Sequence, residues 1–329
     1  MNFWKNKKVI VTGGAGLIGS ALSCDLVESG ALVTIIDNLE RGKLEYIKSI
    51  INKCEIKIAD LRDAGFCNLN IRDCDVVIHM ASKVGGIGYY TSKPYEVMSE
   101  NIRMDSNVLS ACMVNEVPML FYASSAHVYP KELQQTPNSP LIKENESAPA
   151  NPELSYGWAK LIVEKQIEAA VKENLNFKAA IARYIGIYGK NQDFGLDTGS
   201  VIPVFCNRAI NYPEIPFNVW GTGEETRSYC FIRDAVEGTK RMIEAMNSNR
   251  LVGPYNLGKQ ERVSIGEIAK KVVAISGKNI TIDFDTSKET LIWGQWCDCS
   301  KIKNDLGWEA TTSLEDGLKV VYEDVKSRM

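Results

Sequence analysis

Tyr156 and Lys160 are the side chains in this sequence best suited to proton transfer. Residues four apart on a helix project from the same face, so a phenol and an ammonium at this spacing can act on one ligand. A free phenol titrates at about pH 10 and is a poor base at neutral pH, but a neighbouring ammonium favours the phenolate and lowers its pKa. The spacing therefore predicts that Tyr156 removes a proton from a substrate hydroxyl.

A glycine-rich run from Thr12 to Gly19 predicts a binding site for a phosphate-bearing cofactor. It follows a short apolar strand expected at Lys8–Thr12, and its glycines are spaced GxxGxxG. In that pattern the first glycine allows a tight turn, the second lets backbone approach a pyrophosphate, and the third packs helix on strand. The helix N-terminus then offers free N–H groups and a partial positive charge. The residues expected around the pyrophosphate are Gly13, Gly16, Leu17, Ile18 and Gly19.

Asp37, which ends the second expected strand, favours NAD as the cofactor. Its carboxylate can accept hydrogen bonds from both ribose hydroxyls of an adenosine, whereas it would repel the 2′-phosphate of NADP. Arg41 lies four residues after Asp37 and could instead pair with the 2′-phosphate of NADP. Asp60 and Leu61 follow the third strand and are expected beside the adenine, although Asp60 could instead cap the next helix. With the Tyr–Lys pair, a nicotinamide cofactor predicts hydride chemistry on an alcohol or ketone.

The sequence SSAH follows the apolar run MLFYA at the carboxyl end of another expected strand. Open α/β sheets bind ligands at that edge, so Ser125 is expected to hold the reacting oxygen against Tyr156. His127 could be a proton donor in the site, because histidine titrates near neutral pH, or a loop residue satisfied by backbone. The sequence leaves both interpretations open. His79, inside the run DVVIHMA, is expected to line the cofactor pocket without reacting.

Composition narrows the class of protein. The 329 residues carry a formal net charge of −3, which argues against a broad basic face for nucleic acid or an anionic membrane. Nine scattered cysteines show no CxxC pairing, and two histidines are too few for a His-rich site, so no metal site is predicted. The start of the chain does not resemble a signal peptide, and no apolar run approaches membrane-spanning length. We expect a soluble cytoplasmic protein with free thiols.

Strands and helices alternate along the first half of the chain, which predicts an α/β fold with a Rossmann-type, doubly wound parallel sheet. The elements then become shorter, so a smaller α+β substrate-binding lobe is expected. The expected strands are Lys8–Thr12, Ala31–Asp37, Glu55–Ala59, Asp75–Met80 and Met119–Ser124, with a return to the sheet at Tyr255–Leu257. The predicted division places residues 1–184 and about 225–258 in an NAD-binding domain, and about 185–224 and 259–329 in the lobe.

Motifs spread over nearly the whole chain resemble the extended short-chain dehydrogenase/reductase family, and within it the NAD-dependent nucleotide-sugar epimerases and dehydratases. The motifs are TGGAGLIGS, IIDN, HMAS, YASSAHVYP, YGWAK, RYIGIYG, VIPVF, WGTGEETRSYCFIRD, YNLG and DCSKIKNDLGW. The resemblance implies a Ser125/Tyr156/Lys160 triad, a retained NAD that Asn38 and Ala81 also contact, and oxidation at C4 of a nucleotide-linked sugar. It also implies a homodimer built through the helices at Glu96–Val114 and Tyr156–Val171.

Within that family, KVGGIG and YASSAHVYP are most similar to the GDP-mannose 3,5-epimerase and GDP-fucose synthase branches, which favours a GDP-linked sugar. Several positions depart from those branches. His127 stands where the 3,5-epimerases carry a cysteine acid/base, Gly195 stands where their lysine partner is expected, and Ser200 replaces a histidine of the synthases. Ala126-His127 also replaces the Asp-Glu pair of the dehydratases, which argues against dehydration. By resemblance, the expected substrate-binding residues are Gly86, Ser125, Ser200, Arg227 and Trp293, with Arg227 as the diphosphate anchor.

Three functions are consistent with these residues. The preferred one is an epimerase that oxidises the sugar transiently at C4, inverting C4 itself, or else C3 and C5 as in the 3,5-epimerases. The second is a net oxidoreductase that oxidises or reduces a sugar at C4, since the triad would be identical. The third is a non-catalytic NAD-sensing protein, which the retention of both Tyr156 and Lys160 disfavours.

Overall fold

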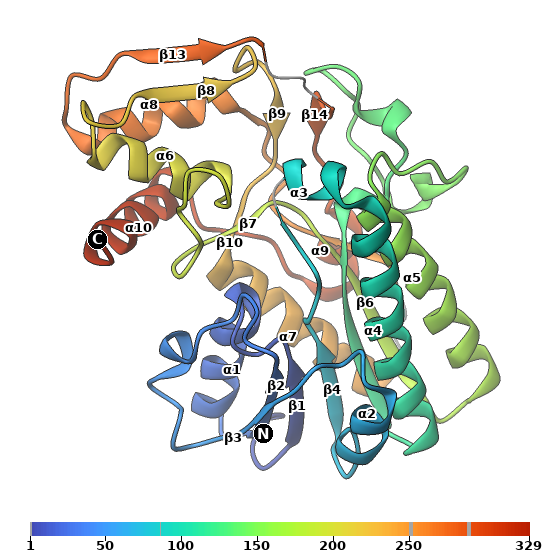
Figure 1. Ribbon diagram of the computed structural model, residues 1–329. Helices are drawn as coiled ribbons and strands as arrows, with labels where there is room; N and C mark the ends of the chain where they lie inside the picture. The colour runs from blue at the N-terminus through green and yellow to red at the C-terminus, as the bar shows by residue number, and fades with distance from the viewer. Residues whose placement is uncertain (1, 86, 250–252, 288–290) are drawn as a thin grey trace.

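A computed structural model describes residues 2–85, 87–249, 253–287 and 291–329. Its centre is a seven-stranded sheet, parallel throughout, with the strand order β11-β6-β5-β4-β1-β2-β3 (Figure 1). The strands are β1 (Lys8–Thr12), β2 (Leu32–Asp37), β3 (Glu55–Ile58), β4 (Val76–His79), β5 (Met119–Ser125), β6 (Lys178–Tyr184) and β11 (Tyr255–Leu257). The chain order reverses between β1 and β4, the place where open α/β sheets bind ligands.

The predicted fold class is therefore confirmed, and the five strands expected in the first half agree with the observed ones to within one residue at each end. The return strand β11 is also present and pairs with β6. Strand β6, with the sequence KAAIARY, was not predicted separately. Its three alanines are poor strand formers, so the local signal was weak, and burial of the strand on both faces decides its conformation.

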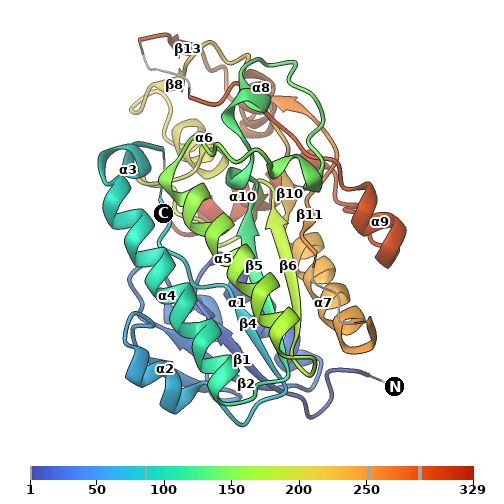
Figure 2. The same cartoon turned by 90° about the vertical axis from the view of Figure 1, so that its right-hand side faces the viewer.

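Helices cover both faces of the sheet, as its continuous apolar strands require. Alternate residues of β1 point to opposite faces: Val9 and Val11 pack with α1 (Leu17–Glu28) and α7 (Ile232–Asn249), while Ile10 packs in the other layer. That second layer consists of α2 (Ala64–Asn70), α4 (Pro94–Val114) and α5 (Ser155–Glu173). In Figure 2, α4 and α5 run side by side across the sheet, which brings residues of both helices next to the ends of β4 and β5.

A smaller lobe lies beyond the carboxyl ends of the strands (Figure 1). Its helices are α6 (Val201–Ile210), α8 (Ile265–Ser276) and α10 (Leu314–Ser327), which pack on one another beside the parallel pair β8 (Phe217–Trp220) and β13 (Ile282–Asp285). The remaining strands are β7 (Ile187–Tyr188), β9 (Thr226–Arg227), β10 (Cys230–Phe231), β12 (Val263–Ser264) and β14 (Gly294–Gln295). The remaining helices are α3 (Ile87–Ser92) and α9 (Ser300–Leu306), and the short 3-10 turns are Leu44–Ile47, Ala126–Val128, Lys131–Gln134 and Glu144–Ser147.

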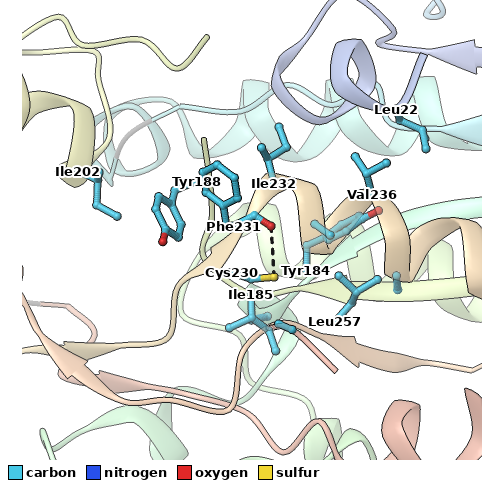
Figure 3. Close-up of a cluster of buried hydrophobic side chains, with 14 of the residues drawn as sticks. Leu22, Tyr184, Ile185, Tyr188, Ile202, Cys230, Phe231, Ile232, Val236 and Leu257 are labelled. Atoms are coloured by element: carbon cyan, nitrogen blue, oxygen red, sulfur yellow. Dashed lines mark hydrogen bonds between the residues drawn. The ribbon is translucent and has the colours of Figure 1, made fainter. Parts of the chain in front are cut away.

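The sheet and the lobe share one apolar core. Figure 3 shows Leu22 of α1 and Val236 of α7 in the same cluster as Tyr188 of β7 and Ile202 of α6. Because this core is continuous, the lobe is held in a fixed place above the carboxyl edge of the sheet, where the predicted site residues lie. Among the described residues, no helix is long and apolar enough to cross a membrane.

Candidate active site

The glycine run forms a tight turn between β1 and α1. Gly13 has a φ of +65°, and a side chain there would approach the Ala81 backbone nitrogen to 2.6 Å. A Cβ on Gly19 would lie 2.1 Å from the Gly13 carbonyl oxygen, so the third glycine is needed where helix meets turn. Gly16, the N-cap of α1, has no side-chain cap, and the first turn of the helix contains no acidic residue. The N–H groups at this helix end, from Leu17 and Ile18 onward, are therefore placed to hold a diphosphate.

Asp37 lies at the end of β2, next to this turn. Its two carboxylate oxygens accept the backbone N–H groups of Ala15 at 2.9 Å and Leu39 at 2.8 Å. Each oxygen keeps a lone pair for a ribose hydroxyl, so the carboxylate is both fixed and available. Asn38 accepts the backbone N–H of Glu40, 3.0 Å away, and is exposed. Arg41, the feature that would suit NADP, donates instead to the Val84 carbonyl at 3.0 Å.

Asp60 does not cap the following helix, which corrects one of the two roles predicted for it. Asp63 is the N-cap of α2, accepting the backbone N–H of Phe66 at 3.0 Å. The Asp60 carboxylate pairs with the Arg62 guanidinium, which lowers the pKa of Asp60 to about 2. Leu61 is buried, and its carbonyl accepts Asn107 Nδ2 at 2.9 Å. These two residues lie beyond β3, and a role beside the adenine remains a prediction.

Tyr156 lies on the first turn of α5, and Lys160 lies one turn further on the same buried face. The Lys160 ammonium is 5.8 Å from the centre of the Tyr156 ring. Helix α5 comes very close to the turn after β5, because a side chain on Gly157 would lie 2.0 Å from the His127 carbonyl oxygen. The glycine in YGWAK therefore sets the distance between the Tyr156 helix and the end of β5.

Ser125 and His127 lie at that end of β5, as the sequence predicted. Ser125 Oγ accepts the backbone N–H of His127 at 3.2 Å. The His127 ring lies edge-on to the Tyr156 ring with 5.9 Å between centroids. Tyr90 of α3 completes this aromatic group, stacked on Tyr156 at 5.2 Å and edge-on to His127 at 6.1 Å. Two groups capable of proton transfer, Tyr156 and His127, thus lie ring against ring at the carboxyl end of β5.

Burial moves the pKa values of Tyr156 and His127 further from neutral pH, upward for Tyr156 and downward for His127. Desolvation raises the pKa of Tyr156 to about 12, which a contact with Ser82 partly opposes and the Asp105 carboxylate reinforces. Desolvation, together with the positive charge of Arg227, lowers the pKa of His127 to about 4. His127 is therefore neutral at pH 7 and can accept a proton, whereas Tyr156 needs additional positive charge to ionise.

Lys160 is almost fully buried and lies 3.2 Å from the carboxylate of Asp105, a residue of α4. The same carboxylate accepts the Tyr122 hydroxyl at 2.6 Å and contacts His79 Nε2 at 3.0 Å. His79 Nδ1 in turn is 2.6 Å from the hydroxyl of Thr12, which precedes the glycine turn. His79 is therefore a buried, hydrogen-bonded residue, in line with the non-reacting role expected for it.

Besides Ser125 at the end of β5, three of the expected substrate residues, Arg227, Trp293 and Ser200, lie beyond the carboxyl edge of the sheet. Arg227 donates to the carbonyls of Thr226 and Ile292, both at 2.8 Å, and burial lowers its pKa. Its positive charge contributes to the lowered pKa of His127, and its role as diphosphate anchor remains a prediction. Trp293 is held by backbone hydrogen bonds to Gln134 and Thr226. Ser200, the exposed N-cap of α6, accepts Gln192 Nε2 at 3.0 Å. Gly86 lies outside the described residues.

Four residues around Tyr156 and Lys160 were not predicted from the sequence: Ser82, Tyr90, Asn101 and Asp105. Ser82 Oγ lies 3.5 Å from the Tyr156 hydroxyl and donates to Asn101 Oδ1 at 2.9 Å. A signal for two of them was present, because Asn101 and Asp105 share a helical face with buried Val97 and Val108. Polar residues on such a face need buried partners. Tyr90 had no comparable signal, since its role depends on how α3 packs.

Comparison with known proteins agrees with this geometry. The model of the NAD dependent epimerase/dehydratase family matches residues 9–258. The chain is 30% identical over 329 residues to GDP-mannose 3,5-epimerase 1 of Oryza sativa subsp. indica, covering 99% of this chain and 84% of the relative. It is 30% identical over 325 residues to a putative UDP-glucose 4-epimerase of Methanocaldococcus jannaschii, covering 97% and 98%.

A solved structure has the same fold over its whole length. It is the UDP-N-acetylglucosamine 4-epimerase of Methanobrevibacter ruminantium in complex with UDP-N-acetylmuramic acid, with a TM-score of 0.87 and 25% identity over 99% of this chain and 100% of that one. The uncapped α1 N-terminus, the turn that only glycines fit and the fixed Asp37 carboxylate suit a dinucleotide. NAD is the cofactor of the matching family. The chain is thus an NAD-dependent enzyme of the short-chain dehydrogenase/reductase superfamily and belongs to the NAD dependent epimerase/dehydratase family.

Proposed function

We propose that this protein is a nucleotide-sugar epimerase that acts through transient oxidation at sugar C4, on a GDP-linked sugar. The observation that supports this most is the direct ring contact of Tyr156 and His127, two proton-transfer groups 5.9 Å apart between ring centroids. The 30% identity to a GDP-mannose 3,5-epimerase over almost the whole chain supports the GDP moiety. Known relatives and solved structures of the fold also include UDP-sugar epimerases, so both nucleotides belong in the test.

In this mechanism Ser125 and Tyr156 hold the C4 hydroxyl at the carboxyl end of β5, and Tyr156 takes its proton. Lys160 supplies positive charge below the Tyr156 ring, at 5.8 Å from its centre. Bound NAD supplies the hydride acceptor and afterwards the hydride donor. Tyr156, now protonated, gives a proton back to the C4 oxygen when the sugar is reduced again. The raised pKa of Tyr156 suits this returning step and opposes the first one, so the first step depends on the positive charge of Lys160, and of the oxidised nicotinamide when bound, to favour the phenolate.

We assign the inversion to C4, with inversion at C3 and C5 as the competing outcome. Inversion at C4 requires that the 4-keto sugar turn in the pocket and accept hydride on its other face, for which Ser125, Tyr156 and Lys160 suffice. Inversion at C3 or C5 requires an acid and a base on opposite faces of the ring. His127 is neutral at pH 7 and fits the base. Inversion at C4 needs no second acid/base, which favours C4.

Proton NMR and mass analysis of products formed in D2O from GDP- and UDP-hexoses test this proposal. A C4-inverted product without solvent deuterium is expected. Deuterium at C3 or C5 would instead assign 3,5-epimerase chemistry with His127 as acid/base. Net accumulation of a 4-keto or reduced sugar, together with free cofactor exchange, would contradict the proposal and identify a C4 oxidoreductase.

We also propose that two copies pair through α4 and α5, whose neighbouring positions on one face of the sheet suit a four-helix arrangement with a second copy. Tyr95, near the start of α4, is 84% exposed and could contribute to this contact. The nine free thiols suit the reducing cytoplasm that we propose as its location. Size-exclusion chromatography with light scattering would test the pairing, and a monomer at micromolar concentration would contradict it.

A further inference from the structure

Asp105 is a buried carboxylate on α4, directly beneath the proposed catalytic pair. Its residue is 1% exposed, and one oxygen, Oδ1, lies 3.0 Å from His79 Nε2. The other oxygen, Oδ2, is 3.2 Å from Lys160 Nζ and 2.6 Å from the Tyr122 hydroxyl. Three different elements, α5, β4 and β5, therefore direct polar atoms at one side chain.

Lys160 needs such a partner in order to stay charged. The residue is 1% exposed, and an ammonium buried without an opposite charge tends to lose its proton. The other groups facing it are the ring of Tyr122, 4.7 Å away, and the ring of Tyr156, 5.8 Å away, which attract a cation but carry no net charge while protonated. Asp105 is the carboxylate paired with Lys160 among the ion pairs of the described residues.

A second buried carboxylate nearby has a different partner. Glu164, one turn after Lys160 on α5, is fully buried and pairs with Arg183 of β6 at 2.6 Å. It also accepts the Ser124 hydroxyl. Since arginine stays protonated in proteins, this pair needs no help to keep its charge. Asp105 and Glu164 are thus equally buried. They differ in their partners, because lysine can lose its proton when buried and arginine does not.

We propose that Asp105 is a positioning residue, the counter-ion that keeps Lys160 protonated and fixes its ammonium beneath Tyr156. Burial by itself would raise the pKa of Asp105, but Lys160, His79 and Tyr122 together lower it below its ordinary value, so Asp105 is a carboxylate at neutral pH. His79, fixed on its other side by Thr12, orients that carboxylate. The ion pair between Lys160 and Asp105 does not depend on which reaction the protein catalyses, whereas its effect on catalysis rests on the proposed function.

The charge of Lys160 can be measured without any substrate. Full-length enzyme with carbon-13 at the lysine Cε is titrated by NMR, and Lys160→Met identifies the Lys160 signal. In Asp105→Asn the pKa of Lys160 is expected to fall by about one unit or more, the range typical of buried lysines. In the control Glu164→Gln, Lys160 should titrate as in the unmodified protein. An unchanged Lys160 titration in Asp105→Asn would overturn the proposal.

Two further measurements keep the proposal testable. If Asp105→Asn does not fold, Asp105→Asn/Lys160→Met should recover a cooperative thermal unfolding transition, because the uncompensated ammonium is gone; failure of the double variant to fold would contradict the counter-ion role. On an active substrate, the alkaline limb of the pH–rate profile should move to lower pH in Asp105→Asn, since Lys160 then loses its proton earlier. A profile of unchanged shape would indicate a purely structural role. Absence of epimerase activity with a shifted Lys160 titration would refute the proposed function and leave this inference standing.

Discussion

The ring of Tyr90 stacks on the ring of Tyr156, with centroids 5.2 Å apart and planes inclined by 17°. The Tyr90 ring comes from α3, and it also meets the edge of His127. Tyr90 is 7% exposed and Tyr156 is equally buried, so each phenol shields the other from water. This contact helps to explain why desolvation is the main cause of the raised pKa of Tyr156.

Removing that ring should change the acidity of Tyr156. In Tyr90→Ala, water reaches the Tyr156 phenol and its pKa falls, so the acidic limb of the pH–rate profile should move to lower pH while turnover drops roughly tenfold through loss of the dry wall. Tyr90→Phe keeps the ring and should retain the original profile. Steady-state kinetics across pH distinguish the two variants, and identical profiles for all three proteins would show that the stacking has no effect on Tyr156.

Tyr156→Phe should abolish turnover while NAD remains bound. Loss of the hydroxyl removes the proposed general acid/base, an effect of about 10²- to 10⁴-fold. The phenyl ring keeps its place against Tyr90 and His127, so the fold should melt at a similar temperature. Product formation and the NAD content of the purified variant provide the check. Retained activity would mean that another group transfers the proton.

His127 makes stability depend on pH in a defined window. Its pKa is about 4 in the folded chain and about 6.5 when unfolded, so the unfolded chain binds more protons between these values. Stability should therefore fall as the pH is lowered from about 6.5 to about 4, by about 2 kcal/mol once the partial exposure of the ring is considered. Urea unfolding of the wild type and His127→Asn at both pH values measures this contribution. An equal acid loss in both proteins would contradict it.

Gly157→Ala should destabilise the protein and displace Tyr156. The added Cβ would meet the His127 carbonyl oxygen at 2.0 Å, a backbone atom that moves only with the whole turn. Overpacking of this kind costs about 1–3 kcal/mol. Gly88→Ala is the matched control, because its Cβ would meet nothing within 4 Å. Thermal unfolding of the two variants tests the difference. Equal melting temperatures would show that the turn at His127 can move without loss of stability.

Much of the fold could be predicted because it depends on local patterns. Apolar runs ending in glycine or acidic residues defined β1 and β2, and the two-sided burial of Val9, Ile10 and Val11 follows from their continuous apolar character. Strand β6 was not predicted because alanine has a low strand propensity. Pairing with β5 on one side and β11 on the other determines its conformation.

In the candidate site, too, the local relationships could be predicted and the long-range contacts could not. Tyr156 and Lys160 were recognisable because four residues of helix fix their relation, whereas the Lys160–Asp105 contact joins residues 55 positions apart. The role of Asp60 as a cap was a wrong alternative because Asp63 offered the same chemistry three residues later. The stacking of Tyr90 on Tyr156 depends on where α3 packs, and a local sequence pattern does not predict that.

The most direct test of the central claim uses a GDP-hexose with deuterium at C4, incubated with the purified enzyme and no added cofactor. Transient oxidation at C4 predicts a product with inverted C4 configuration that keeps the deuterium at C4, since the hydride leaves and returns within one active site. Loss of the label to solvent, or formation of the epimerised product by Tyr156→Phe at the wild-type rate, would contradict it.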